Sequence, residues 1–248
     1  MVAGRSPASV FARTDKGMID KRVETIAAAL EGLGDGASIM VNGFGGTGVP
    51  FALIRALEEM DARDLTLILN GVRFVDGFAP GIFNAKRVAK VIVSAARSRG
   101  PDTSNYERQW LDGELEIEMV PQGTFAERMR AGGAGIPAFF TPTGAGTDLA
   151  AGKEERMFDG RPCILETALT ADFALIRAAR VDRWGNVRFR GTQGNFGLAM
   201  AMAGRVTVIE TSDASDAPIP PEDVHVPGIF VDRVFQCEDM SPANAGGL

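Results

Sequence analysis

A glycine-rich turn at residues 42–48, NGFGGTG, is the segment of this 248-residue chain whose residue types most directly suggest a binding site. It follows a short apolar run, Ser38 to Val41, that favours a β-strand, and Pro50 stands where an amphipathic helix begins. Its four glycines let the backbone bend sharply and approach a ligand closely. Because such a loop presents backbone N–H groups at a helix N-terminus, we predict that it binds phosphate or another anion.

The same glycines also fit a dinucleotide site. The spacing G-x-G-x-x-G at residues 43–48 is typical of dinucleotide-binding loops, so an NAD(P)-dependent oxidoreductase is one alternative. Such a fold expects an acidic residue at the end of the next strand, about 20 residues on, to bind the ribose. Here that strand, Leu65 to Leu69, is followed by Asn70 instead. Taken alone, the loop is also compatible with a turn that only closes a strand–helix corner.

Composition argues against several classes of partner. The chain has 26 Lys and Arg residues against 32 Asp and Glu, a net charge of −6, which gives no basic footprint for nucleic acid. No apolar run approaches the ~20 residues that span a bilayer, and no signal peptide is visible, so we expect a cytoplasmic protein without a membrane partner. Cys163, Cys237 and the single histidine, His225, lack metal-ligand spacing, so we expect neither a metal site nor a permanently bound cofactor.

The apolar runs predict an α/β fold. Strands at residues 38–41, 65–69 and 88–94 alternate with helical patterns in the first half, whereas the second half is rich in short strands. We therefore predict an open, mainly parallel sheet flanked by helices, with a β-rich annex. Asn70 would then lie beside the glycine turn at the carboxyl edge of the sheet, where ligands bind in such folds.

Local patterns also give expectations about boundaries. Residues 18–240 would form the domain, between a flexible N-terminal extension (1–17) and a flexible C-terminal tail (241–248). The spacing of apolar residues predicts an amphipathic helix over residues 19–33. Residues 121–123, Pro-Gln-Gly, would begin a loop after a half-exposed strand.

A second glycine-rich region, residues 132–147, combines Gly, Thr and Pro around a short apolar run. This composition fits a second ligand loop and a structural crossover about equally well. The charged segment that follows, residues 148–160, is expected to project into solvent.

Long motifs connect the chain to a known family. The strand–turn–helix segment from Asp35 to Pro50, the run from Tyr106 to Thr147, the run from Leu165 to Asn186 and the Asn-Phe-Gly segment at 195–197 resemble the A (alpha) subunit of the family I 3-oxoacid CoA-transferases. The resemblance extends over residues 18–236. It implies the fold of that family and a subunit of an enzyme that moves CoA from succinyl-CoA to a 3-oxo acid.

The resemblance also implies which residues act. In the family a glutamate of the B half, within a Glu-x-Gly turn, attacks the thioester and carries CoA as a glutamyl thioester. This chain contains no Glu-x-Gly turn. Glu166 is the glutamate that comes nearest to this motif, and we interpret it as structural. A separate B subunit, in an A2B2 assembly, is therefore expected, with acyl-CoA as substrate.

Two amides, Asn70 and Gln122, match positions that contribute to the active-site wall in the family. Without the resemblance, they would be interpreted as a strand-end turn residue and a loop residue. The loop matching the family's CoA-binding turn comprises Asn42, Gly43, Phe44, Gly45, Gly46, Thr47 and Gly48.

Three departures from the family pattern are candidate determinants of substrate choice. Asn42 replaces a glycine, residues 71–74 (GVRF) lack the usual asparagine pattern, and residues 193–194 (Gln-Gly) replace an Ala-Arg pair. The start of the domain and the Asn-Phe-Gly segment favour 3-oxoadipate as acceptor, with acetoacetate next. A CoA-thioester hydrolase or ring-opening subunit of the same fold and a metabolite-binding module are the alternatives.

Overall fold

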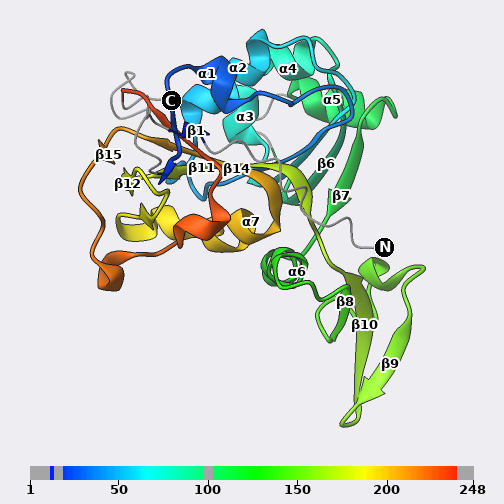
Figure 1. The fold of residues 1–248 in the computed structure, drawn as a ribbon. Helices are drawn as coiled ribbons and strands as arrows, with labels where there is room; N and C mark the ends of the chain where they lie inside the picture. The colour runs from blue at the N-terminus through cyan, green and yellow to red at the C-terminus, as the bar shows by residue number, and fades with distance from the viewer. Residues whose placement is uncertain (1–11, 14–18, 98–102, 239–248) are drawn as a thin grey trace.

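An eight-stranded parallel sheet forms the centre of the molecule in the computed structural model, which describes residues 12–13, 19–97 and 103–238 (Figure 1). Every pair of neighbouring strands in this sheet is parallel. The order across the sheet is β3 (Arg22–Val23), β16 (Arg233–Gln236), β14 (Gly204–Thr211), β11 (Ala171–Ala178), β4 (Ser38–Val41), β5 (Leu65–Gly71), β6 (Val88–Ala95) and β7 (Glu116–Met119). The predicted open, mainly parallel sheet is confirmed.

Both faces of the central strands are buried, as a parallel sheet requires. Ile39 of β4 and Leu67 of β5, which face one core, are each 0% exposed, and Met40 and Ile68 of the same strands, which face the other core, are 0% and 1% exposed. Strands with nearly continuous apolar sequence need cover on both faces, and crossover helices provide it. β5 runs beyond the predicted strand, so that Asn70 is a strand residue at the carboxyl edge.

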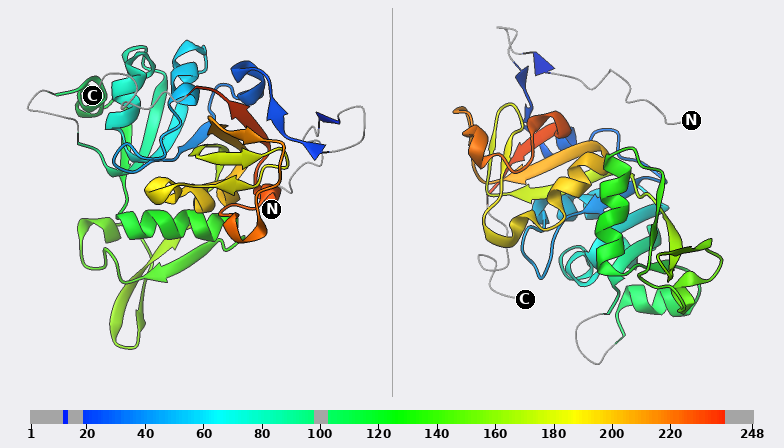
Figure 2. Two further views of the ribbon diagram at one scale, coloured as in Figure 1. Left: turned by 90° about the vertical axis from the view of Figure 1, so that its left-hand side faces the viewer. Right: turned by 90° about the horizontal axis from the view of Figure 1, so that it is seen from below.

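Helices cover the two faces of the sheet in unequal numbers (Figures 1 and 2). One face carries α1 (Ile26–Ala29), α2 (Phe51–Glu59), α3 (Arg73–Phe78), α4 (Pro80–Asn84) and α5 (Asn105–Leu111). The other face carries α6 (Gln122–Gly133) and α7 (Gly197–Ala203). Each layer packs a separate apolar core against the sheet, which holds the strand ends in fixed positions.

Two small sheets form the predicted β-rich annex. The first is an antiparallel arm that extends away from the body (Figure 1). It consists of β8 (Ala138–Thr141), β10 (Arg161–Thr167) and β9 (Glu155–Phe158); the second sheet consists of β13 (Val187–Arg188), β12 (Arg180–Asp182) and β15 (Ala214–Ser215). Short 3-10 helices are η1 (Asp148–Ala150), η2 (Gly191–Gly194), η3 (Pro221–Asp223) and η4 (Gly228–Phe230). The segment 148–160 is mostly exposed, as expected, but contains η1 and β9.

Most of the predicted terminal extensions, 1–17 and 241–248, lie outside the described residues. Within the first of them, β1 (Ala12–Arg13) pairs with β2 (Ile19–Asp20). In the part of the chain that the structure describes, no helix has the length and apolar character needed to cross a membrane.

The predicted helix over residues 19–33 is wrong. β2 and β3 occupy its first part, and α1 begins only after Thr25, whose hydroxyl accepts a hydrogen bond from the Ala28 N–H at 3.1 Å. Val23 pairs with Phe235 at the edge of the sheet. The strand therefore depends on a partner from the far end of the chain, and helical periodicity in the local sequence could not reveal it.

The predicted loop at residues 121–123 is also wrong, because the helix begins directly after Pro121. Pro121 is the N-cap of α6, and Gln122 is the first residue of that helix. Phe125 and Met129 are buried on the same face of α6, which explains why the helix forms against the sheet. Gln122 is thus held by a twelve-residue helix and not by a loop.

A buried carboxylate joins the neighbouring strands β14 and β11 to α2. Glu210, near the end of β14, is 0% exposed and accepts a hydrogen bond from the Leu53 N–H at 3.0 Å. Its other oxygen lies 2.6 Å from Arg177 on the neighbouring strand β11. Burial raises the pKa of the Glu210 carboxyl, while the Leu53 and Ala52 N–H groups and the charge of Arg177 oppose this effect. The carboxylate therefore caps α2 and neutralises Arg177.

Replacing Glu210 with alanine is expected to destabilise the fold strongly. The change leaves the Arg177 guanidinium buried without this carboxylate and the first turn of α2 without its acceptor. Removing one partner of such a pair costs about 3–5 kcal/mol of unfolding free energy, which urea denaturation would measure. Glu222→Ala is the matched control, because Glu222 is exposed in η3. Equal unfolding curves for the two variants would contradict the role assigned to Glu210.

Candidate functional site

The strand order places the glycine turn at the point in the sheet from which the chain adds strands first on one side and then on the other. From β4 the chain builds β5, β6 and β7 on one side, then returns to build β11, β14 and β16 on the other. Ligands bind outside the carboxyl ends of strands at such a switch point. The Asn42 N–H, directly after β4, donates to the Leu175 carbonyl of β11 at 3.0 Å. The turn therefore starts at the place in the fold most suited to a site.

The turn itself is a tight hairpin. Phe44 and Thr47 exchange two backbone hydrogen bonds of 3.0 Å each. Gly45 and Gly46 between them have φ values of 59° and 90°, the left-handed pair that a two-residue hairpin needs. The Phe44 side chain is 49% exposed at the tip. The hairpin projects from the sheet edge, and its Phe44 and Thr47 N–H groups are used within it.

At the N-terminus of α2, where the sequence predicts an anion site, the structure has a carboxylate of the chain itself. Glu210 already occupies this helix end, where it accepts from the Leu53 N–H. A phosphate there would have to replace a buried carboxylate that is also paired with Arg177. This geometry also argues against the dinucleotide alternative, which requires a pyrophosphate at the same helix end.

Two amide side chains fasten the hairpin to the turn around η2. Asn42 is 1% exposed, and its Nδ2 donates to the Gln193 carbonyl at 3.2 Å and to the Gly48 carbonyl at 3.5 Å. The Asn195 Nδ2 donates to the Thr47 and Gln193 carbonyls, both at 3.2 Å. The hairpin and the η2 turn thus form one wall, and the Asn42 side chain acts from inside it.

The three departures from the family pattern meet at this wall. Asn42 bonds to Gln193, and the ring of Phe74, in the GVRF segment, packs against Gly46 of the hairpin. Residues that are far apart in the sequence therefore lie together around one loop. This arrangement supports their interpretation as determinants of substrate choice.

The Asn70 and Gln122 amides meet, although they are far apart in the sequence. The Gln122 Nε2 donates to the Asn70 Oδ1 at 2.9 Å. Ser94, opposite Asn70 on β6, donates to the same oxygen at 2.8 Å. Because the oxygen accepts from both neighbours, the orientation of the Asn70 amide is fixed and its Nδ2 remains available as a donor. Gln122 is exposed and Asn70 half-buried, so a ligand can reach both.

Helix α6 adds donors beside this amide pair. No side chain caps its N-terminus, and its first turn carries no acidic residue. The backbone N–H groups of Gln122 and Gly123 begin the helix next to Asn70. Amide and backbone donors together can stabilise a developing oxyanion without bringing in a full positive charge.

Ser94 was not identified from the sequence. A usable signal was present, because Ser94 is a polar residue near the end of an apolar strand, as Asn70 is. Glu210 and Arg177 were also missed, and only the pairing of β11 with β14 brings them together. His225 is structural, as expected: its Nδ1 accepts from the Phe189 N–H at 2.9 Å.

Glu166 lies in an ionic network at the base of the arm. It is 3% exposed, and its oxygens lie 2.6 Å from the Lys153 Nζ and 3.9 Å from the Arg128 Nε. Arg128 also pairs with Glu118 of β7 at 2.6 Å. The carboxylate is thus occupied by structural partners, which supports the interpretation of Glu166 as structural.

Two other regions show no features of a site. Residues 132–147 contain the end of α6, the strand β8 and several turns. In one of these turns the Thr147 hydroxyl donates to the Gly144 carbonyl at 2.7 Å, and the whole segment fits a structural crossover.

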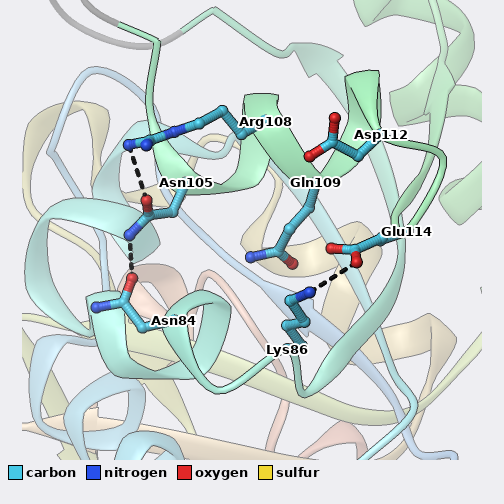
Figure 3. A pocket seen from close by; sticks show the side chains of 7 residues that line it. All are labelled: Asn84, Lys86, Asn105, Arg108, Gln109, Asp112 and Glu114. Atoms are coloured by element: carbon cyan, nitrogen blue, oxygen red, sulfur yellow. Dashed lines mark hydrogen bonds and ion pairs between the residues drawn. The ribbon is translucent and has the colours of Figure 1, made fainter.

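A hollow of about 350 Å³ between α4 and α5 is polar (Figure 3). Two of its charged side chains, Lys86 and Glu114, form an ion pair of 2.6 Å. No predicted site residue lines it, and the described ranges hold no cluster of three metal-ligating side chains.

Comparison with known proteins gives matches over most of the chain. A family model described as "Coenzyme A transferase" matches residues 23–236. The A subunit of the succinyl-CoA:3-ketoacid coenzyme A transferase of Xanthomonas campestris pv. campestris (strain B100) is 50% identical over 216 residues, which are 86% of this chain and 88% of that protein. The A subunit of the 3-oxoadipate CoA-transferase of Pseudomonas putida is 45% identical over 218 residues, which are 88% of this chain and 94% of that protein.

Solved structures share the fold at lower identity. A variant of the decarboxylase AibA/AibB superposes with a TM-score of 0.74 at 22% identity, over 88% of this chain and 84% of that chain. At this identity the likeness concerns the fold alone. It supports the arrangement of sheet and helices described above.

The contact between the hairpin and the η2 turn gives a test of the wall. A Cβ on Gly48 would lie 2.7 Å from the Gln193 carbonyl oxygen, whereas a Cβ on Gly45 would meet nothing within 4 Å. Both glycines have positive φ, 79° and 59°, so each change to alanine carries a similar backbone cost. We expect Gly48→Ala to lower the unfolding free energy by about 1–3 kcal/mol more than Gly45→Ala, because it also overpacks the contact. Equal losses in urea denaturation would show that the close approach does not matter.

Proposed function

Since this chain belongs to the coenzyme A transferase family, we propose that it forms, with a separate B subunit in the cytoplasm, an enzyme that moves CoA from succinyl-CoA to a 3-oxo acid. The proposed acceptor is 3-oxoadipate, with acetoacetate next, and the proposed assembly is A2B2. The relatives named as A subunits of succinyl-CoA:3-ketoacid and 3-oxoadipate transferases support this reaction type.

The observation that carries the proposal is the Asn70–Gln122 amide pair at the carboxyl edge, joined by a 2.9 Å hydrogen bond. In the proposed reaction the B subunit's glutamate attacks the thioester carbonyl, and the CoA thiolate leaves with the electron pair of the C–S bond. The thiolate then attacks the glutamyl carbonyl, releases succinate and forms the glutamyl-CoA thioester. The acceptor acid is converted by the reverse sequence.

Each of these attacks places a negative charge on a carbonyl oxygen. The free Nδ2 of Asn70, the second hydrogen of the Gln122 Nε2 and the first N–H groups of α6 are the donors proposed to stabilise it. Neutral donors suit this chemistry, because a nearby cation would lower the nucleophilicity of the glutamate carboxylate.

The hairpin is proposed to bind the CoA moiety. Its residues, Asn42 to Gly48, project from the same sheet edge as Asn70, and the exposed Phe44 offers an apolar surface. Within this segment Asn42 would act indirectly, since its buried side chain holds the Gly48 and Gln193 carbonyls. The exposed backbone at Gly45 and the Thr47 side chain remain the direct contacts.

Activity should require both subunits. This chain alone should give no CoA transfer from succinyl-CoA to 3-oxoadipate or acetoacetate, whereas the co-expressed A and B subunits should transfer it to at least one. Activity of this chain alone would point to Glu166 as the nucleophile, and Glu166→Gln would test that directly. Hydrolysis of the thioester without transfer by the pair would favour the hydrolase alternative.

Removing either amide should slow the chemical step. In the A–B complex, Asn70→Ala and Gln122→Ala are each expected to lower kcat about 10²–10³-fold, the usual effect of losing one oxyanion donor. KM for succinyl-CoA should change much less. The control is Asn84→Ala, which removes an amide that bonds Asn105 beside the α4–α5 hollow (Figure 3). A kcat loss of the same size in Asn84→Ala, or none in Asn70→Ala, would overturn the proposed roles.

A further inference from the structure

Arg73 stands at the carboxyl edge of the sheet, close to the amide pair. It is the first residue of α3 and lies three positions after Asn70, a stretch that can span at most about 11 Å. Val72, just before it, is 0% exposed and anchors the start of the helix. The Arg73 side chain is exposed to solvent. Its charge is therefore accessible near the residues proposed to act on the thioester.

The Arg73 side chain stacks on the ring of its neighbour Phe74. Its guanidinium carbon lies 4.7 Å from the centroid of the Phe74 ring, a cation–π arrangement. The same ring lies 3.2 Å from the position that a Cβ on Gly46 would take. Arg73 is thus stacked on a ring that itself packs against the hairpin.

The charge of Arg73 has no counterion within the described ranges. Arg177 pairs with Glu210 and Arg128 pairs with Glu118, each at 2.6 Å, whereas no described carboxylate lies within ion-pair distance of Arg73. The acid one turn further along α3, Asp76, is half-buried, and burial and Glu107 raise its pKa. An exposed guanidinium that stacks on a ring and has no described carboxylate partner is suited to bind an anionic group from a ligand.

We propose that Arg73 binds the second carboxylate of a dicarboxylic substrate and so makes the enzyme prefer dicarboxylic 3-oxo acids. 3-Oxoadipate carries such a carboxylate and acetoacetate does not, while the succinyl group of the donor carries one as well. The planar guanidinium can bind it through two parallel N–H bonds. This inference rests on the proposed function and adds a specificity residue that takes no part in the bond-breaking steps.

Arg73→Met in the purified A–B complex tests the inference. We expect kcat/KM for 3-oxoadipate to fall roughly tenfold, and kcat/KM for acetoacetate to stay unchanged, because only the first acid offers a second carboxylate. Arg73→Lys should give an intermediate value for 3-oxoadipate, since it keeps the charge but not the two-bond geometry. Because the proposed reaction passes through a covalent enzyme intermediate, kcat/KM for the acceptor acid depends only on the half-reaction with the acceptor and not on the half-reaction with succinyl-CoA.

Arg55→Met is the matched control, because Arg55 is an exposed arginine of α2. It should leave the ratio of the two kcat/KM values at the wild-type level. An equal loss with both acids would place Arg73 on the CoA moiety, which is common to both reactions, and would overturn the inference, as would no change with either acid. A wild-type complex that transfers CoA to neither acid would instead refute the proposed function itself.

Discussion

The buried Glu210 carboxylate is the interaction on which the geometry of the site depends. It links β14, β11 and the start of α2, since it pairs with Arg177 and accepts from the Leu53 N–H. The hairpin is suspended between β4 and α2, so its two ends are fixed only if both elements are. Burying an ionised group is costly, and this one is retained with hydrogen bonds and a countercharge. It also fills the helix end that a phosphate would otherwise occupy.

The wall of the site combines two rigid parts with different roles. Asn42 and Asn195 tie the hairpin to the η2 turn through main-chain carbonyls, which fixes a projecting loop without using its tip. Ser94 and Gln122 bind the same oxygen of Asn70 and so determine which end of that amide faces a ligand. Donors that are oriented before the substrate arrives need no reorganisation during the reaction, and this is the physical basis of oxyanion stabilisation.

In the proposed reaction the chain supplies neutral donors at its amide pair, and the B subunit supplies the nucleophile. Its own candidate carboxylate, Glu166, is engaged by Lys153 and Arg128 at the base of the arm. The division has a chemical advantage, because an amide wall stabilises an oxyanion without pairing with the attacking carboxylate. Arg73, which stacks on the Phe74 ring, supplies a cation at the same edge of the sheet, and its proposed role is to recognise a substrate carboxylate.

The sequence by itself determined the mainly parallel sheet, the glycine-rich turn after β4 and the place of Asn70 at the carboxyl edge, because apolar runs and glycine spacing report local backbone preference. Its long motifs also indicated the family. Only the tertiary structure decided that residues 19–23 are strands, that Gln122 begins a helix, and that Glu210 caps α2. The Leu53–Glu210 and Asn70–Gln122 contacts join residues 157 and 52 positions apart. Such contacts follow from strand order, and the periodicity of a local segment carries no information about which distant strand becomes its neighbour.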